Sequence, residues 1–131
     1  MPNASNLTVH RRRRTIAVGG FSLIELLVVI AIISILAAVA VPQFFAYKAR
    51  AVDAVMHSDL KNAALAMESY YATYRSYPAS IAVLTASGFL SSSGVGVTVS
   101  LLTATSYTVT AAASGGTQAS YTLNSVTGLI N

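Results

Sequence analysis

Hydrophobic residues are concentrated in one unbroken stretch near the start of the chain, from Phe21 to Val41. Within it only Ser22, Glu25 and Ser34 are not apolar. As a helix, the stretch is expected to be roughly 31 Å long, which matches a bilayer hydrocarbon core of about 30 Å. The pattern therefore predicts a segment that can span a membrane. An ionisable side chain in lipid is costly and usually functional, so Glu25 is a candidate functional residue.

A second periodic pattern follows the span, from about Pro42 to Tyr74. Apolar residues recur there at helical spacing, and charged residues fall on a different face. This pattern predicts an amphipathic helix within the segment 42–75, continuous with the span. We expect a kink or loosening at Pro42, because its ring crowds the preceding turn, and an end before the Tyr77-Pro78 step. The predicted apolar face consists of Val52, Met56, Leu60, Ala63, Met67, Tyr70 and Tyr74.

Apolar and polar residues alternate in the last part of the chain, residues 76–131, which is typical of short antiparallel strands. A small sheet needs cover on one face, and the apolar face of the helix is available. The sequence thus predicts an α+β fold, in which a sheet of three or four strands packs on the second half of a long N-terminal helix. The expected strands lie near 95–102, 106–113 and 118–123, with a fourth candidate at 126–130. The aromatic residues assigned mainly to the core are Tyr70, Tyr71, Tyr74, Tyr77, Phe89, Tyr107 and Tyr121.

Charge is unevenly distributed along the chain. The formal net charge of +4 comes from Arg11–Arg14, whereas the residues after Gly20 carry no net charge. A clustered basic face, as nucleic-acid binding requires, is therefore not expected on the folded domain. Residues 76–131 contain no charged side chain and no histidine, so they offer neither a general acid or base nor a carboxylate cage for calcium. The chain also lacks cysteine, which excludes disulfides and thiol chemistry.

One group of titratable residues on the amphipathic helix could suggest chemistry. Asp53, His57 and Lys61 follow one another at four-residue spacing, which places them side by side on one helix face. We interpret them as a solvated ion-pair ladder and not as a metal or catalytic site. The sequence therefore predicts neither an enzyme nor a bound cofactor or metal.

The first twenty residues read as a basic leader. Arginines that flank a span stay on the cytoplasmic side, so the N-terminus is predicted to be cytoplasmic and the domain after the span exported. An ordinary secretory signal has its small-residue cleavage site after the apolar region, whereas the Gly19-Gly20 pair lies before it. Cleavage at this pair would remove residues 1–20 and leave the apolar helix, residues 21–41, at the N-terminus of the mature protein.

The run GGFSLIELLVVIAIISILAAVAVPQF, Gly19 to Phe44, resembles the N-terminus of type IV prepilins. These carry the class III signal peptide that type IV pilins share with the pseudopilins of type II secretion systems. The resemblance implies a pilin-like fold, cleavage between Gly20 and Phe21 by a prepilin peptidase, and N-methylation of the new Phe21 amine. It also implies assembly through Glu25. On physical grounds, a carboxylate in a low-dielectric bundle is tolerable beside a positive charge, which the Phe21 amine of a neighbouring subunit could supply.

The resemblance implies a structural function. The chain is expected to be a major pilin that polymerises into an extracellular filament for motility, adhesion, DNA uptake or a similar surface function. Its expected partners are identical subunits in a helical homopolymer, the prepilin peptidase and methyltransferase, and the inner membrane with its pilus assembly machinery. The precursor is expected in the inner membrane. Two alternatives stay open at this point, a pseudopilin of a type II secretion system and a plain single-span membrane protein.

Overall fold

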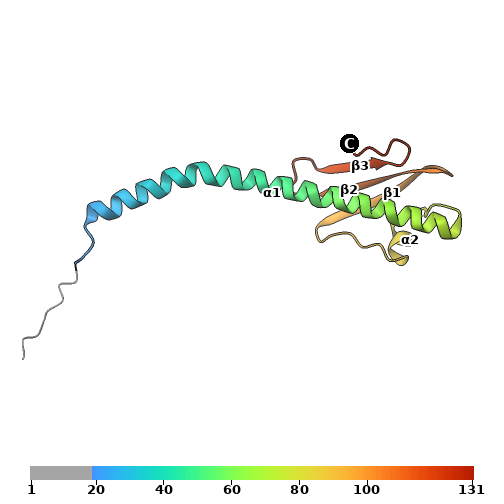
Figure 1. Ribbon diagram of the computed structural model, residues 1–131, viewed down its shortest axis with the longest axis horizontal. Coiled ribbons are helices and arrows are strands. Elements are labelled where there is room, and N and C mark those ends of the chain that lie inside the picture. The colour runs from blue at the N-terminus through green and yellow to red at the C-terminus, as the bar shows by residue number, and fades with distance from the viewer. Residues whose placement is uncertain (1–18) are drawn as a thin grey trace, which may run out of the picture. The chain divides into compact units, whose positions relative to one another are not determined.

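The computed structural model describes residues 19–131. Arg11–Arg14 and most of the predicted leader lie outside the described residues. The chain divides into two units, one ending at Ala37 and one from Ala38 to Asn131, and each is described by itself. The elements, labelled in Figure 1, are α1 (Leu23–Tyr74), α2 (Ile81–Ala86), β1 (Val95–Thr103), β2 (Ser106–Ala113) and β3 (Ser120–Asn124).

Helix α1 contains both helical segments that the sequence predicts. Pro42 lies inside it without interrupting it, and a kink at that position stays a prediction. The helix ends at Tyr74, as predicted. Arg75 takes a left-handed conformation with φ of 57°, and its N–H donates to the carbonyl oxygen of Tyr71 at 2.8 Å, a common way to end a helix.

The strands form one antiparallel sheet in the order β1-β2-β3. Val97 is paired with Ala111, and Ala111 with Tyr121, so buried side chains of all three strands share one face. The three predicted strands are confirmed, with ends that differ by at most two residues. The fourth candidate, at 126–130, is only an isolated bridge between Ile130 and Leu123.

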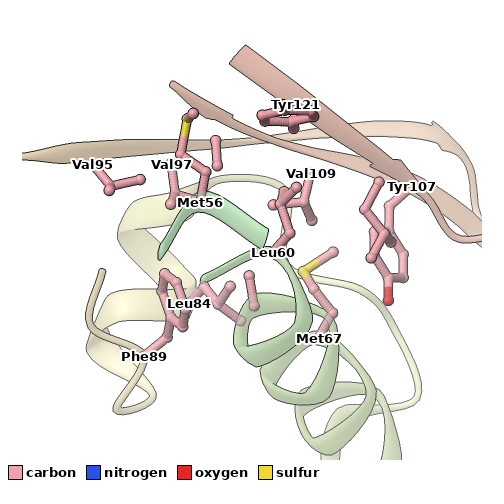
Figure 2. Packing of buried hydrophobic residues seen from close by; sticks show 13 residues of the cluster. Met56, Leu60, Met67, Leu84, Phe89, Val95, Val97, Tyr107, Val109 and Tyr121 are labelled. Carbon is pink, nitrogen blue, oxygen red and sulfur yellow. The ribbon is translucent and has the colours of Figure 1, made fainter. Parts of the chain in front are cut away.

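The core of the second unit lies between the apolar face of α1 and one face of the sheet. Figure 2 shows Met56, Leu60 and Met67 of α1 directed toward side chains of the strands. This packing confirms the α+β, pilin-like fold. The buried cluster consists of Met56, Leu60, Ala63, Met67, Leu84, Phe89, Val95, Val97, Tyr107, Val109, Ala111, Tyr121 and Leu123.

The connecting segment between α1 and β1 contains a short helix, α2, that the sequence did not predict. Leu84 of α2 and Phe89 just after it are buried in the same cluster, and both lie beside the α1 core residues in Figure 2. Six residues are too few for a periodic pattern to be recognised. Burial of Leu84 and Phe89, and not intrinsic helix propensity, accounts for this element.

The assignment of Tyr74 to the core is wrong. Its side chain is 62% exposed, and its ring packs at a tilt beside that of Tyr70, with centroids 4.4 Å apart. Tyr77, and not Tyr74, contacts the buried Tyr107, with ring centroids 4.7 Å apart. Helical periodicity gives the direction of a side chain but not where the covering sheet stops, and Tyr74 lies two turns beyond Met67, the last buried residue of α1.

Candidate functional site

The predicted cleavage point lies just before the start of α1. Residues 19–22 are not helical, and the helix begins at Leu23. The backbone N–H of Ser22 donates to Oε2 of Glu25 at 2.9 Å. A serine followed three positions later by glutamate is the spacing of a capping box, and a negative charge is favourable at a helix N-terminus. The Gly20-Phe21 bond therefore lies in non-helical chain that leads into a capped helix.

Gly20 is not required by the fold around it. A Cβ atom added there would have no neighbour within 4 Å, and the same holds for Gly19. If glycine is needed at position 20, the requirement comes from an enzyme that recognises this segment and not from packing within the chain.

The segment 21–41 exposes apolar side chains on all sides. Phe21 is 86% exposed, and every large apolar side chain from there to Val41 is exposed as well. By length and composition, α1 is the one helix among the described residues that could cross a membrane, and its most apolar window has a mean hydropathy of 3.0 with none of it buried. A core helix of a soluble protein would be mostly buried. This surface therefore needs lipid or another protein as its cover.

Two residues of the predicted ion-pair ladder, Asp53 and His57, are half-buried against the C-terminal part of the chain. The carboxylate of Asp53 accepts hydrogen bonds from the backbone N–H of Thr117 at 2.9 Å and from its Oγ1 at 2.5 Å. The Thr117 hydroxyl is the main reason that the pKa of Asp53 is lowered. The ring of His57 packs on Tyr121, with centroids 4.4 Å apart. Asp53 thus holds the loop between β2 and β3 against α1, and His57 contacts strand β3.

Asp59 is a structural residue that the sequence analysis did not single out. It is only 2% exposed, and it accepts hydrogen bonds from the backbone N–H and Oγ of Ser92, each at 2.8 Å. Its position offers a signal, because Asp59 lies three residues after Met56 and four before Ala63, on the predicted apolar face. A carboxylate on such a face must find partners.

The carboxylate of Glu68 accepts hydrogen bonds from the hydroxyl groups of two tyrosines. The hydroxyl of Tyr77 donates to its Oε1 at 3.0 Å, and that of Tyr107 donates to the same oxygen at 3.1 Å. Burial, followed by the nearby Glu68 carboxylate, raises the pKa of both phenols. Asp53, Asp59 and Glu68 thus each attach a different part of the second unit to α1. Within residues 19–131 no group of three or more His, Cys, Asp or Glu side chains could hold a metal ion.

Comparison with known proteins identifies both parts of the chain. Residues 17–41 match the family described as "Prokaryotic N-terminal methylation motif". Residues 42–123 match the family described as "Type IV minor pilin ComP, DNA uptake sequence receptor". The second match alone covers more than half of the chain.

Two curated proteins are similar to the chain. "Type IV wide pilus major component PilA4" of Thermus thermophilus is 45% identical over 100 residues, which are 75% of this chain and 76% of that protein. "Type IV major pilin protein PilA" of Myxococcus xanthus is 44% identical over 52 residues, 40% of this chain and 24% of that protein. The methylation motif, the long helix with its three-stranded sheet, and these relatives agree. The chain therefore belongs to the type IV pilins, the structural subunits of type IV pili.

Proposed function

We propose that this pilin is a major subunit, cleaved between Gly20 and Phe21, that polymerises into an extracellular filament through its apolar helix. The observation that carries the proposal is the uncovered surface of residues 21–41, in which Glu25 is the one ionisable side chain. Lipid covers this surface in the precursor, and identical helices cover it in the filament. Because both surroundings are apolar, packing and a charge pair are left to favour assembly.

The charge pair proposed for assembly joins Glu25 of one subunit to the Phe21 amine of its neighbour. Cleavage at Gly20 creates that amine, and a methyltransferase then methylates it. The bond from Ser22 occupies part of the hydrogen-bonding capacity of Glu25, and an ionised carboxylate has about four acceptor positions. Glu25 can therefore cap its own helix and accept a neighbour's amine at the same time.

The proposed location follows from the same segments. A prepilin peptidase in the inner membrane removes residues 1–20 on the cytoplasmic side, where Arg11–Arg14 hold the leader. The second unit then lies outside the cytoplasm, and assembly carries it to the cell surface. This order of events distinguishes the proposal from a plain single-span membrane protein, which would keep its leader.

A second candidate function comes from the family that matches residues 42–123, whose description names a DNA uptake sequence receptor. DNA binding depends on basic side chains that neutralise phosphates. The second unit has four basic residues, Lys48, Arg50, Lys61 and Arg75, against three acidic ones, and none of its charges lies in 76–131. This charge distribution favours a filament subunit over a DNA receptor. Retention of duplex DNA by purified filaments at physiological salt would favour the receptor.

Whether the protein binds calcium distinguishes a pilin from the pseudopilin alternative. Major pseudopilins of type II systems resemble this chain at the N-terminus but hold calcium in the C-terminal region, and a hard cation prefers carboxylate oxygens. Residues 76–131 contain no Asp or Glu. We expect thermal unfolding of the purified protein to be unaffected by a chelator, and a melting temperature that falls in chelator would favour the pseudopilin.

The deciding experiment is mass spectrometry of filaments sheared from cells. The proposal predicts that this chain is the dominant species, that it begins at Phe21, and that its amine carries one methyl group. Gly20→Val should leave an uncut precursor in the membrane, and the absence of contacts at Gly20 means that the substitution does not disturb the described fold. Filaments that persist after deletion of the gene, or a mature protein that retains residues before Phe21, would overturn the proposal.

A further inference from the structure

The segment of α1 directly after the apolar span lies outside the packed core of the second unit. The first residue of α1 that packs against the hydrophobic core is Val52. Before it, Phe44, Phe45 and Tyr47 are 64%, 62% and 64% exposed, and Lys48 and Arg50 are exposed as well. Three large aromatic rings within four positions, on a part of α1 that no other described residue covers, are not explained by the fold.

These five side chains surround the helix and do not form a stripe. At 100° per residue they spread over more than half of its circumference. A helix that packs on one partner has its apolar residues on one face, so this distribution indicates surroundings that are similar on several sides. The Arg50 guanidinium lies over the Tyr47 ring, 5.8 Å from its centroid, so basic and aromatic groups form one cluster.

The position of the cluster fits the layer of lipid headgroups. Aromatic residues are enriched at membrane–water interfaces, where their amphipathic rings lie at the headgroup level. Phe44, Phe45 and Tyr47 follow Val41, the end of the span, by three to six residues, which is about 4.5 to 9 Å along a helix. An interfacial layer is about 5 to 8 Å thick on each side of the hydrocarbon core. Lys48 and Arg50 come next, where long basic side chains can extend to lipid phosphates.

We propose that Phe44, Phe45, Tyr47, Lys48 and Arg50 form an interfacial belt that fixes the depth of the precursor in the bilayer and binds anionic lipid headgroups. The belt lies at the end of the span opposite the leader. It therefore holds the Gly20-Phe21 bond at a constant depth at the other interface. This inference rests on the proposed function, because it takes the precursor to be anchored in a membrane.

A test is possible in the full-length chain because it has no cysteine. A single spin label at Ala46→Cys reports the depth of the belt in vesicles of phosphatidylcholine, with or without phosphatidylglycerol. Labels at Ile33→Cys in the span and Ser58→Cys in the second unit give the lipid and water references. We expect the Ala46 label to be protected from a water-soluble nickel complex, with accessibility between those of the two references.

Removing the aromatic rings should release the label into water. In the variant Phe44→Ala, Phe45→Ala, Tyr47→Ala, we expect loss of the protection at position 46, while Leu65→Ala, an exposed apolar residue of α1 outside the belt, leaves it unchanged. In Lys48→Gln with Arg50→Gln, we expect loss of the difference between the two kinds of vesicle.

Three results would overturn the belt. The first is an Ala46 label as accessible as the Ser58 label in the unsubstituted chain. The second is unchanged protection in the aromatic variant. If the aromatic variant also loses filaments, these residues are assigned to contacts between copies. The third is a difference between the two kinds of vesicle that persists in Lys48→Gln with Arg50→Gln, which would overturn the binding of anionic headgroups. A water-accessible Ile33 label would instead show that the span itself is not inserted, and it would overturn the proposed membrane anchoring as well.

Discussion

Asp59 of α1 and Ser92, thirty-three positions apart in the chain, are joined by two hydrogen bonds of 2.8 Å to the two carboxylate oxygens. Asp59 thereby holds the segment just before β1 against helix α1. No buried side-chain polar atom among the described residues lacks a partner, so this carboxylate is buried and satisfied at once.

Asp59→Ala should lower the free energy of unfolding by about 1.5 to 3 kcal/mol, because hydrogen bonds to a charged group contribute about that much. Denaturant unfolding of the full chain in detergent, followed by the near-UV circular dichroism of its tyrosines, measures the change. Ser58→Ala is the matched control, since Ser58 is its exposed neighbour on α1 and should change stability by less than about 0.5 kcal/mol. Equal effects from the two substitutions would contradict the role of Asp59.

The contact between Asp53 and Thr117 should give stability that depends on pH. Folding lowers the pKa of Asp53 below its ordinary value of 3.8, so its carboxylate stabilises the fold above that value. The contribution is lost as pH falls through the lowered pKa. We expect Asp53→Asn to reduce the melting temperature at neutral pH, and the difference from the unsubstituted chain to close below about pH 4. Thr117→Val, which removes the hydroxyl donor, should follow the same profile, and a difference that stays constant with pH would count against this account.

The loop that Asp53 holds has no room for a side chain at Gly116. A Cβ there would lie 3.0 Å from the backbone carbonyl oxygen of Gln118, which cannot turn away as a side chain can. It would also lie 2.5 Å from Oδ1 of Asp53 and 3.0 Å from the terminal methyl carbon of Met56. Gly116→Ala should therefore displace the Asp53 carboxylate and destabilise the chain by about 1 to 3 kcal/mol, as overpacking typically does. Gly96→Ala is the control, because its Cβ would meet only the carbonyl oxygen of Ala112 at 3.8 Å. Similar melting temperatures for both variants would show that the loop can move.

Two tyrosines test where the core ends. Tyr107 is 2% exposed, and truncating a buried aromatic residue costs about 3 to 5 kcal/mol. We expect Tyr107→Ala to destabilise the chain by that amount, and Tyr74→Ala, on the exposed side, by less than about 0.5 kcal/mol. Tyr107→Phe should fall between them, since it removes only the hydrogen bond to Glu68. A large effect at Tyr74 in the isolated subunit would restore the core assignment.

The sequence predicted the elements better than it predicted the contacts between them. Periodicity gave the continuous helix and three strands, because each pattern is long enough to repeat, and the Tyr77-Pro78 step indicated where the helix ends. It missed α2, whose six residues cannot show a period. It also placed Tyr74 in the core, because periodicity does not locate the end of the sheet.

Partners that are far apart in the chain explain the remaining misses. Asp53 is bound to a residue sixty-four positions away, and Glu68 to one thirty-nine positions away. Local spacing placed charged residues on a separate helix face and could not indicate partners so far along the chain. The pilin N-terminus, by contrast, is a local motif, and its resemblance was recognisable from the chain alone.

Glu25→Ala should leave cleavage after Gly20 intact and strongly reduce filament yield. It removes the proposed partner of the Phe21 amine without touching the scissile bond. Ser34→Ala is the matched control within the span, because the Ser34 hydroxyl donates a hydrogen bond to the backbone carbonyl oxygen of Ile30 in its own helix, at 2.7 Å. Quantification of sheared filaments and of the processed subunit in membranes separates the two steps. A normal filament yield from Glu25→Ala would show that the carboxylate is dispensable.

The position of Arg75, directly after the last residue of α1, has a consequence for proteolysis. It is the last basic residue of the chain, so a protease that cuts after lysine or arginine has no bond to cleave from Ser76 to Asn131. A tryptic digest would release α2 and the whole sheet as one peptide of 56 residues without a basic side chain, which ionises poorly, and would represent the subunit mainly by peptides of α1. A protease that cuts after leucine can reach the exposed Leu101, Leu102 and Leu129, and it is the better choice for detecting modifications on the serine and threonine hydroxyls of the sheet.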